Sequence, residues 1–529
     1  MFGLKTRVLF DRRDAKSKQS LHRRRLGDST VTSANPGSAN FNCQISQAGS
    51  AFEHFWEHTV GSDHAPIALR ADWQAQIQRC REELGFRYVR FHGLLSDDMG
   101  TLIMHQDRLL YSFFNIDQIF DFLLSIGMRP FVELSFMPTA LASGHATVFR
   151  YAANVTPPKD YAQWAELVTR LVRHWAQRYS LTEVRQWFFE VWNEPNLEPF
   201  WSGTQAQYFS LYEHTARAIK SVDPAFKVGG PATAKNAWID EFVEFCESNQ
   251  VPVDFISTHH YPTDARGHED ADTETQLSNS QRSLLREQLL RAKAQAGKRP
   301  LYYTEWNSSS NPRDPLHDEP YAAAFVIKTV MEAHGMVQAY SFWTFTDIFA
   351  ENYFPSVPFH GGFGLLNLHG IAKPMYRAFE LLHRLGNELL EMEGGHPTVD
   401  TWVVRSTTGL TVLVSNHALP RHPIEPQNLS ITLGAAPAPL SMVFEQIDAD
   451  HANAKALWQA IGAPQYLDAE QLKRLADASA LHPQPQSWRY ENRTIHIEIT
   501  VPPQGVVAIT VEFEQHSVPP VGSQKKVLR

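Results

Sequence analysis

The chain has 529 residues, of which 43% are hydrophobic and 12% aromatic, and its formal net charge is −9. This length exceeds one ordinary compact domain and is enough for an α/β barrel of roughly 250–350 residues with an appended domain. The acidic balance excludes a broad basic surface for nucleic acid, and no apolar run is long enough to span a membrane. We therefore expect neither a nucleic-acid nor a membrane partner.

Residues 1–40 form a basic arm in which arginine and lysine recur, as at Arg12, Lys16 and Arg23. The arm lacks the apolar stretch and the small-residue cleavage site of a secretory signal. A partly disordered tail, or a start codon placed too far upstream, is the simplest explanation; a targeting or nucleic-acid role is the alternative. We expect a cytoplasmic protein, with the periplasm left open.

The region 41–390 alternates short apolar runs, which end in polar or aromatic residues, with stretches of helical period. The candidate strands are 52–60, 87–95, 129–136, 186–195, 226–232, 254–262, 299–307 and 337–345. Helix candidates such as 68–85, 161–180 and 281–297 repeat apolar residues every three or four positions. This alternation indicates parallel strands with helices outside, and eight units predict an α/β fold of the (β/α)₈ TIM-barrel type. No GxGxxG or Walker loop follows a strand, which disfavours a nucleotide-binding sheet.

The pattern changes after residue 390. Alternating or apolar segments separated by Gly, Pro and Asn occur at 401–406, 410–417, 429–434, 494–500 and 505–513. They predict a C-terminal β-sandwich accessory domain over 391–515, with a helical insert near 453–480. Residues 516–529 are expected to form a tail.

Carboxylates and imidazoles gather at the ends of the predicted strands, where barrel enzymes carry their catalytic groups. The fourth strand, WFFEVW, runs into Asn193 and Glu194, and the seventh reaches Glu305. An ionised carboxylate at the end of a core strand is costly unless it is paired or solvated. Strands four and seven lie three steps apart around the ring, so Glu194 and Glu305 should face each other across the mouth.

Two facing carboxylates suit glycoside hydrolysis, in which one donates a proton to the leaving oxygen and the other attacks the anomeric carbon. Repulsion and burial raise the pKa of one carboxyl above that of the other and so divide the roles. A separation of about 5–5.5 Å would imply retention of configuration. Other candidates at strand ends are Glu57, His58, His92, His259, His260, Tyr261, Trp343, Asp347 and Glu351. Each of these taken alone is also explained as an ordinary structural residue.

The motifs around these residues resemble glycoside hydrolase family 39, of the β-xylosidase type. Asn193-Glu194-Pro195 with Thr304-Glu305-Trp306 is typical of a whole clan of retaining barrel glycosidases. The finer similarity is carried by RFHGLLSDD (90–98), VWNEPNL (191–197), HHY (259–261), YYTEWN (302–307), FWTFTDIF (342–349) and FHGGFGLL (359–366). It runs from about residue 50 to 390, and the C-terminal domain resembles the family's accessory domain more loosely.

The resemblance implies that Glu194 is the general acid/base and Glu305 the nucleophile. It further implies that Asn193 and His92 contact sugar hydroxyls, that His259 sits beside the sugar, that Tyr261 hydrogen-bonds Glu305, and that Trp343 forms an apolar floor under the ring. One departure stands out. The family's β-xylosidases tend to carry two acidic residues after TFTDIF, and here Ala350 precedes Glu351, so only Glu351 remains to bind the outer hydroxyls.

The hypothesis that follows is a retaining exo-glycosidase that removes terminal β-D-xylosyl residues from xylo-oligosaccharides by double displacement. The same fold acting on an α-L-arabinoside, a β-glucoside, a β-galactoside or a uronide is the first alternative. A carbohydrate-binding protein without catalysis is the second, and the presence of both carboxylates argues against it. We expect neither a metal nor another cofactor, because two carboxylates suffice and Cys43, Cys80 and Cys246 have no metal-site spacing. Multimeric members of the family leave a homo-oligomer open.

Overall fold

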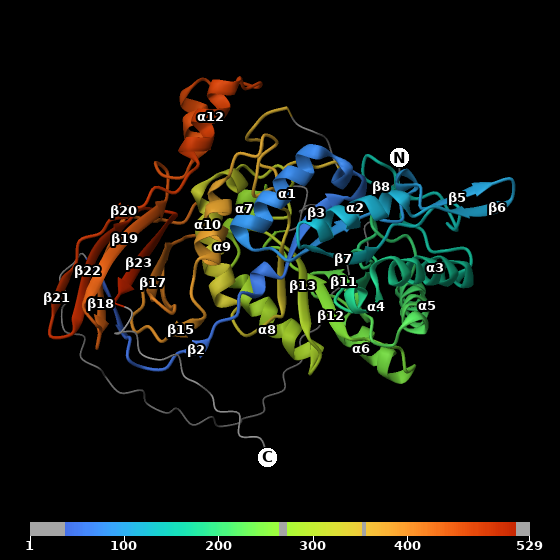
Figure 1. Cartoon of the computed structure of the whole chain (residues 1–529), viewed down its shortest axis with the longest axis horizontal. Helices are drawn as coiled ribbons and strands as arrows, with labels where there is room; N and C mark the ends of the chain where they lie inside the picture. The colour runs from blue at the N-terminus through green and yellow to red at the C-terminus, as the bar shows by residue number, and fades with distance from the viewer. Residues whose placement is uncertain (1–37, 264–271, 352–355, 515–529) are drawn as a thin grey trace, which may run out of the picture. The chain divides into compact units, whose positions relative to one another are not determined.

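The computed structural model describes residues 38–263, 272–351 and 356–514. Most of the basic arm and the tail predicted at 516–529 lie outside these residues. The predicted TIM barrel is confirmed: eight parallel strands close into a ring in chain order. They are β3 (Thr59–His64), β4 (Tyr88–His92), β7 (Arg129–Leu134), β10 (Phe188–Val191), β11 (Lys227–Ala234), β12 (Phe255–His259), β13 (Leu301–Trp306) and β14 (Ala339–Phe342). Figure 1 shows helices on the outer side of these strands.

Helices surround this ring. They are α1 (Ala71–Leu84), α2 (Phe114–Ser125), α3 (Tyr161–Tyr179), α5 (Gln205–Val222), α6 (Ile239–Ser248), α8 (Leu284–Ala296), α9 (Pro320–Glu332) and α10 (Pro374–His383), with short α4 (Leu181–Val184) and α7 (Thr273–Ser278). In α3 the Asp160 side chain caps the first turn by accepting from the Ala162 N–H at 2.8 Å. Trp164, Leu167 and Leu171 recur at helical spacing on its buried face, which explains why the helix packs against the ring. The connections also carry the hairpins β5 (Leu102–His105)–β6 (Arg108–Tyr111) and β8 (Thr147–Val148)–β9 (Ala153–Asn154).

The first barrel strand lies later than expected, and the prediction of a strand over 52–60 is wrong. A 3₁₀ turn, Phe55–Glu57, occupies that stretch and buries Phe55 and Trp56 in the core. A short apolar run has the same composition in a packed turn as in a buried strand. The strand that follows ends at Asp63 and His64.

Glu57 and His58 therefore lie at the amino-terminal end of the barrel, away from the mouth. His58 stacks on Tyr88 at the start of β4, with ring centroids 4.6 Å apart. Next to it, Phe131, Phe188, Phe255 and Tyr302 form a packed aromatic layer. Of the two interpretations of Glu57 and His58, the one that places them at the mouth is wrong, and the structural one agrees with their position.

The accessory domain consists of two antiparallel-rich sheets that pack face to face. The order of the first is β1 (Ser38–Gln44), β18 (Gln427–Gly434), β22 (Thr494–Val501), β21 (Arg489–Glu491). The order of the second is β2 (Ser50–Ala51), β15 (Glu388–Leu390), β16 (Val399–Arg405), β17 (Gly409–Asn416), β23 (Gly505–Phe513), β19 (Pro439–Ile447), β20 (Gln484–Pro485). Val412 and Ile509 of one sheet and Ile431 and Ile497 of the other belong to one buried cluster. The helical insert is present as α11 (Ala454–Ala460) and α12 (Ala469–Ala478).

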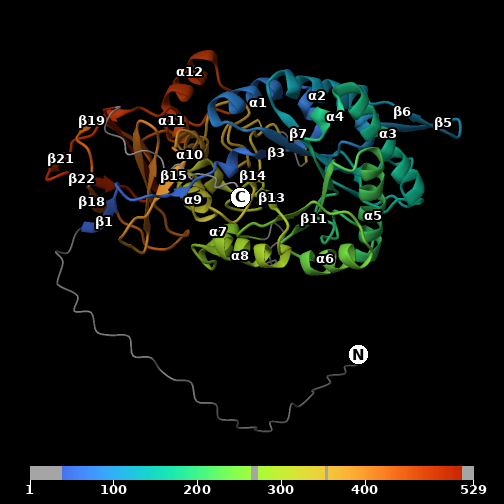
Figure 2. The ribbon, with the colours of Figure 1, turned by 60° about the horizontal axis from the view of Figure 1, so that its bottom comes forward.

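Two strands of the accessory domain come from residues that precede the barrel. Strand β1 pairs parallel with β18, from Ser38↔Asn428 to Gln44↔Gly434 (Figure 2). Strand β2 pairs with β15. The chain thus starts its described course in the accessory domain, passes through the barrel and returns.

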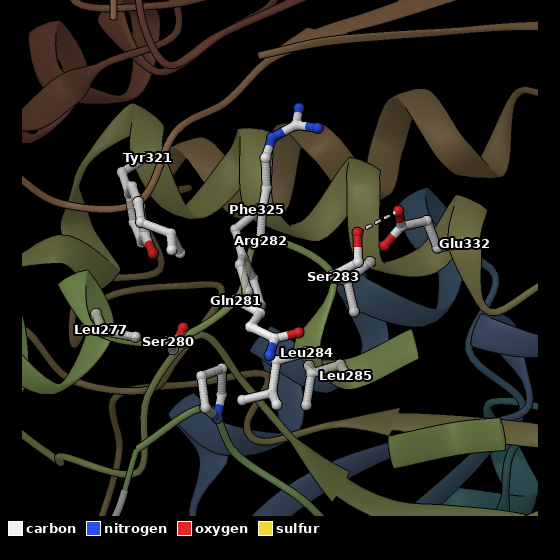
Figure 3. A pocket seen from close by; sticks show the side chains of 13 residues that line it. Leu277, Ser280, Gln281, Arg282, Ser283, Leu284, Leu285, Tyr321, Phe325 and Glu332 are labelled. Atoms are coloured by element: carbon white, nitrogen blue, oxygen red, sulfur yellow. Dashed lines mark hydrogen bonds between the residues drawn. The ribbon is translucent and has the colours of Figure 1, made fainter. Parts of the chain in front are cut away.

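Helix α9 joins the two parts, since its residues from Pro320 to Met331 are buried and it packs against β17 and β23. Beside it, Arg282 donates to the carbonyls of His417 at 2.8 Å and Thr398 at 2.6 Å. Figure 3 shows Arg282 extending past Phe325, and next to it the hydrogen bond between Ser283 and Glu332. The space enclosed here is about 10 Å³, room for about one water and too small for a sugar. Within the described ranges, every helix is too short or too polar to cross a membrane.

Candidate active site

A pocket of about 640 Å³ opens at the carboxyl ends of the barrel strands. Its lining includes every residue to which the resemblance assigns a role except His259: His92, Asn193, Glu194, Tyr261, Glu305, Trp343 and Glu351. Two other candidates at strand ends, His260 and Asp347, are not part of the lining. His259 lies behind the residues that line the pocket. It is fully buried, and its Nδ1 lies 3.0 Å from Glu194 Oε1. A concave site of this size, with apolar walls and a few convergent polar groups, is typical of a small-molecule site.

Glu194 stands on a sharp turn after β10. Trp192 and Glu194 adopt left-handed backbone angles, with φ of 73° and 45°, which cost free energy in non-glycine residues. The Glu194 N–H donates to the carbonyl of Ala232 at 2.8 Å and holds the turn against β11. This turn, rather than a continued strand, places the carboxylate in the pocket.

Glu305 ends β13 opposite Glu194 and has a proton donor on each oxygen. Arg90 Nη1 donates to Oε1 at 2.7 Å, and the Tyr261 hydroxyl donates to Oε2 at 2.9 Å. Burial and the nearby Glu305 carboxylate raise the pKa of Tyr261 well above 10, so its phenol keeps the proton that it donates. These contacts accommodate Glu305 as a carboxylate.

The two carboxyl groups are close. One oxygen of Glu194, one nitrogen of His259 and one oxygen of Glu305 lie within 4.8 Å of one another. Retaining glycosidases place their carboxyl groups about 5–5.5 Å apart, whereas inverting enzymes leave about 6.5–9.5 Å for a water. The spacing here fits the retaining arrangement.

Arg90, which lies inside β4, is fully buried and links four elements beneath the pocket. Its guanidinium contacts Glu190 at 2.5 Å, Glu133 at 2.8 Å and the Asn193 side-chain oxygen at 3.0 Å, besides Glu305. Burial lowers the pKa of Arg90, but these carboxylates outweigh it and raise the pKa above the ordinary value. Sequence reasoning missed Arg90, Glu133 and Glu190, although charged residues inside the apolar runs RYVRF, PFVEL and FFEV were the available signal.

His92 and Trp343 form one side wall. His92 Nδ1 lies 2.8 Å from Glu133 Oε2, and its ring centroid lies 4.7 Å from that of Trp343. Burial opposes protonation of His92, but Glu133 and then Glu305 raise its pKa above 6.5. Gly61 leaves space for the indole, since a Cβ there would lie 2.6 Å from Trp343 Cε3.

The Glu351 carboxyl makes a contact that the sequence did not suggest. It is buried and hydrogen-bonds the carboxyl of Asp63, which ends β3 and also accepts from the Ala350 N–H. Burial, Asp63 and Glu305 raise the pKa of Glu351 well above 4.5. Two buried carboxyl groups in hydrogen-bond contact share a proton. Asp63 therefore places a second acidic side chain next to Glu351, in a chain that has Ala350 where the family's β-xylosidases tend to have an acidic residue.

One further group of histidine and acidic side chains comes close enough to hold an ion in the described part of the chain: His54, Glu57 and His383 at the amino-terminal end. Glu57 Oε1 lies 2.7 Å from His54 Nδ1 and 2.8 Å from His383 Nδ1. Hydrogen bonds account for this group, and we assign no ion to it. The expectation that no metal or cofactor takes part stays a prediction.

Comparisons with known proteins agree with this geometry. The family described as glycosyl hydrolases family 39 matches residues 41–494. The chain is 50% identical to a β-xylosidase of Caldicellulosiruptor saccharolyticus, over 87% of this chain and 95% of that protein. It is 37% identical to a β-xylosidase of Geobacillus stearothermophilus, over 87% of this chain and 93% of that protein. The crystal structure of a monomeric β-xylosidase from Caulobacter crescentus CB15 superposes with a TM-score of 0.79 at 32% identity, covering 90% of this chain and 99% of that one.

Proposed function

The chain belongs to glycosyl hydrolases family 39, and from this premise we propose that it is a retaining β-xylosidase. Its substrate is a xylo-oligosaccharide, from which it removes the terminal β-D-xylosyl residue. The observation that carries the mechanism is the pair Glu194 and Glu305, with carboxylate oxygens within 4.8 Å across one pocket. The assignment of xylose as the sugar is supported by the relatives, which are named as β-xylosidases.

The proposed reaction has two displacements. In the first, Glu305 attacks the anomeric carbon while Glu194 gives its proton to the departing oxygen, so that a xylosyl-enzyme forms. In the second, Glu194 takes a proton from water, which attacks the same carbon and frees Glu305. Arg90 and Tyr261 hold Glu305 in position. Asn193 and His92 bind sugar hydroxyls, and Trp343 lies under the ring.

The charge of the pocket supports a neutral sugar over a uronide. Glu351, proposed to bind the outer hydroxyls, lies against Asp63. A uronide carboxylate at that end would meet the negative charge that this proton-sharing pair carries, and like charges in a buried site disfavour binding.

The test is proton NMR of the enzyme acting on p-nitrophenyl β-D-xyloside. β-Xylose appearing before mutarotation supports retention and the substrate class together, whereas α-xylose first would contradict the role of Glu305. A panel with α-L-arabinoside, β-glucoside, β-galactoside and uronide substrates ranks the alternatives. The homo-oligomer expected from the family stays a prediction for light scattering, and the Caulobacter relative is described as monomeric.

A further inference from the structure

A buried chain of hydrogen bonds runs from Glu194 through His259 and Thr304 to Glu190. Glu194 Oε1 lies 3.0 Å from His259 Nδ1, and His259 Nε2 lies 3.0 Å from Thr304 Oγ1. The Thr304 hydroxyl lies 2.8 Å from Glu190 Oε1. His259 and Thr304 are fully buried, so their polar atoms must satisfy one another.

The position of each proton follows from the Glu190 end. Glu190 is paired with the Arg90 guanidinium at 2.5 Å, and an ionised carboxylate only accepts hydrogen bonds. Thr304 must therefore donate its single proton to Glu190. Its oxygen is then left to accept from His259 Nε2–H.

A neutral imidazole carries one N–H, so His259 Nδ1 presents a lone pair to Glu194. Burial lowers the pKa of His259 to about 4, which keeps the ring neutral near pH 7. The 3.0 Å contact then needs a proton on the Glu194 carboxyl. The opposite tautomer would take the Thr304 proton and leave two acceptor oxygens facing each other at 2.8 Å.

We propose that Thr304 is a positioning residue that sets the tautomer of His259 and thereby keeps Glu194 protonated before the substrate is cleaved. This inference rests on the proposed role of Glu194 as the general acid. A general acid must hold its proton when the leaving group departs. The hydrogen bonds through Thr304 favour the protonated form of Glu194, although Thr304 does not touch the substrate.

Other charged and titratable groups also face Glu194 or His259 from the surrounding elements. Among the described residues they are Arg90 on β4, Glu133 on β7, Glu190 on β10, Lys235 after β11, Tyr261 after β12, Glu305 on β13 and Glu351 after β14. A substitution at position 304 removes none of them. It therefore isolates the effect of one hydroxyl.

The experiment compares Thr304→Val with Thr304→Ser, using the pH profile of kcat/KM on xylobiose. Valine keeps the shape but lacks the hydroxyl, so His259 is free to carry its proton on Nδ1 and to donate it to an ionised Glu194. In the Val variant the apparent pKa of the alkaline limb should fall by about one unit. At pH values above the alkaline limbs of both proteins, kcat/KM of the variant should then be roughly tenfold lower than that of the wild type. The Ser variant keeps the hydroxyl and should keep the limb of the wild type.

A dinitrophenyl β-D-xyloside is the matched control, because its leaving group departs without a proton. On this substrate the Val variant and the wild type should have the same kcat/KM. An unshifted limb in the Val variant, or an equal shift in the Ser variant, would overturn the inference. If the thermal midpoint shows that the Val variant is unfolded, Thr304→Ala makes the same test. Failure of the proposed function would look different from failure of this inference. It would appear in the wild type itself, as inversion of configuration or as no hydrolysis of xylosides.

Discussion

Glu194 and Glu305 are both buried carboxyls, and their different partners fit the proposed roles of Glu194 as acid and Glu305 as nucleophile. Glu305 has a donor on each oxygen, whereas Glu194 Oε1 lies 3.0 Å from His259 Nδ1, which carries a lone pair in the tautomer that we propose. Changing Glu305 to Gln removes the nucleophile and leaves the side-chain shape. We expect kcat to fall by roughly 10⁴-fold or more, measured on p-nitrophenyl β-D-xyloside. Retained turnover would contradict the role, and Glu57→Gln at the opposite end of the barrel is the control.

Loss of the acid has a different signature. Glu194→Ala should slow xylobiose hydrolysis by roughly 10²–10⁴-fold, because an alkoxide leaves poorly without a proton. An aryl xyloside with a good leaving group should be much less affected in its first step. Added azide should restore turnover and yield β-xylosyl azide, since it needs no general base. Equal losses on both substrates would contradict the role.

Asp63 and Glu351 carry a prediction about sugar binding. Asp63→Ala removes the partner that shares a proton with Glu351, so the affinity for free xylose should fall by roughly tenfold. Because the pKa of Glu351 is raised, the pair loses its shared proton only at higher pH. The carboxylates of Asp63 and Glu351 then repel each other, so the wild type should bind xylose more weakly there. Asp63→Asn cannot ionise and should abolish this alkaline weakening. Calorimetric titration of xylose across pH measures both, and parallel pH curves for wild type and the Asn variant would contradict the shared proton.

At the scale of elements, Arg90 connects strands that are far apart in sequence. From β4 it contacts side chains at β7, β10 and β13. Lysine has a single ammonium and cannot reproduce the planar fork, so Arg90→Lys leaves buried carboxylates unpaired. We expect a loss of about 3–5 kcal/mol in the free energy of unfolding, measured by urea denaturation. Arg170→Lys, in an exposed pair with Glu166, should change it by less than about 1 kcal/mol.

The same elements show what the sequence could predict. Buried parallel strands are apolar throughout, so Glu194 and Glu305 at their ends were visible as exceptions, and the ring placed them face to face. The strand at β3 was misplaced because Phe55 and Trp56 pack equally well in a turn. The contact of Asp63 with Glu351 arises only when β3 and β14 become neighbours by closing the barrel, and no local pattern signals such a contact.

At the scale of the whole molecule, the barrel and the accessory domain are connected both through the chain and through buried contacts. Strand β1 precedes the barrel but pairs with β18, and the paired residues, such as Ser38 and Asn428, lie far apart in the sequence. Helix α9 belongs to the barrel and packs on β17 and β23. Arg282 adds a salt bridge to Asp400 at 2.5 Å. These contacts favour unfolding of the two parts together rather than one after the other.

His417, which follows β17, makes this junction sensitive to acid. Its ring lies against Tyr321 and Phe325 of α9, with centroids 5.2 and 6.0 Å away. Both ring nitrogens are buried without a hydrogen-bond partner among the described residues. Burial, then Arg282 and Lys328, lower the pKa of His417 well below 6.5.

Below pH 6.5 the unfolded chain therefore binds a proton at His417 that the folded chain rejects. Stability falls as the pH drops through this window, by up to about 1.4 kcal/mol per pH unit for this one group. His417→Leu keeps an apolar side chain of similar size and should flatten the decline by that amount, while the Arg282 hydrogen bond to the backbone carbonyl remains. Urea denaturation at several pH values between 5 and 7 measures the two slopes. Equal slopes would contradict a lowered pKa of His417 in the folded protein.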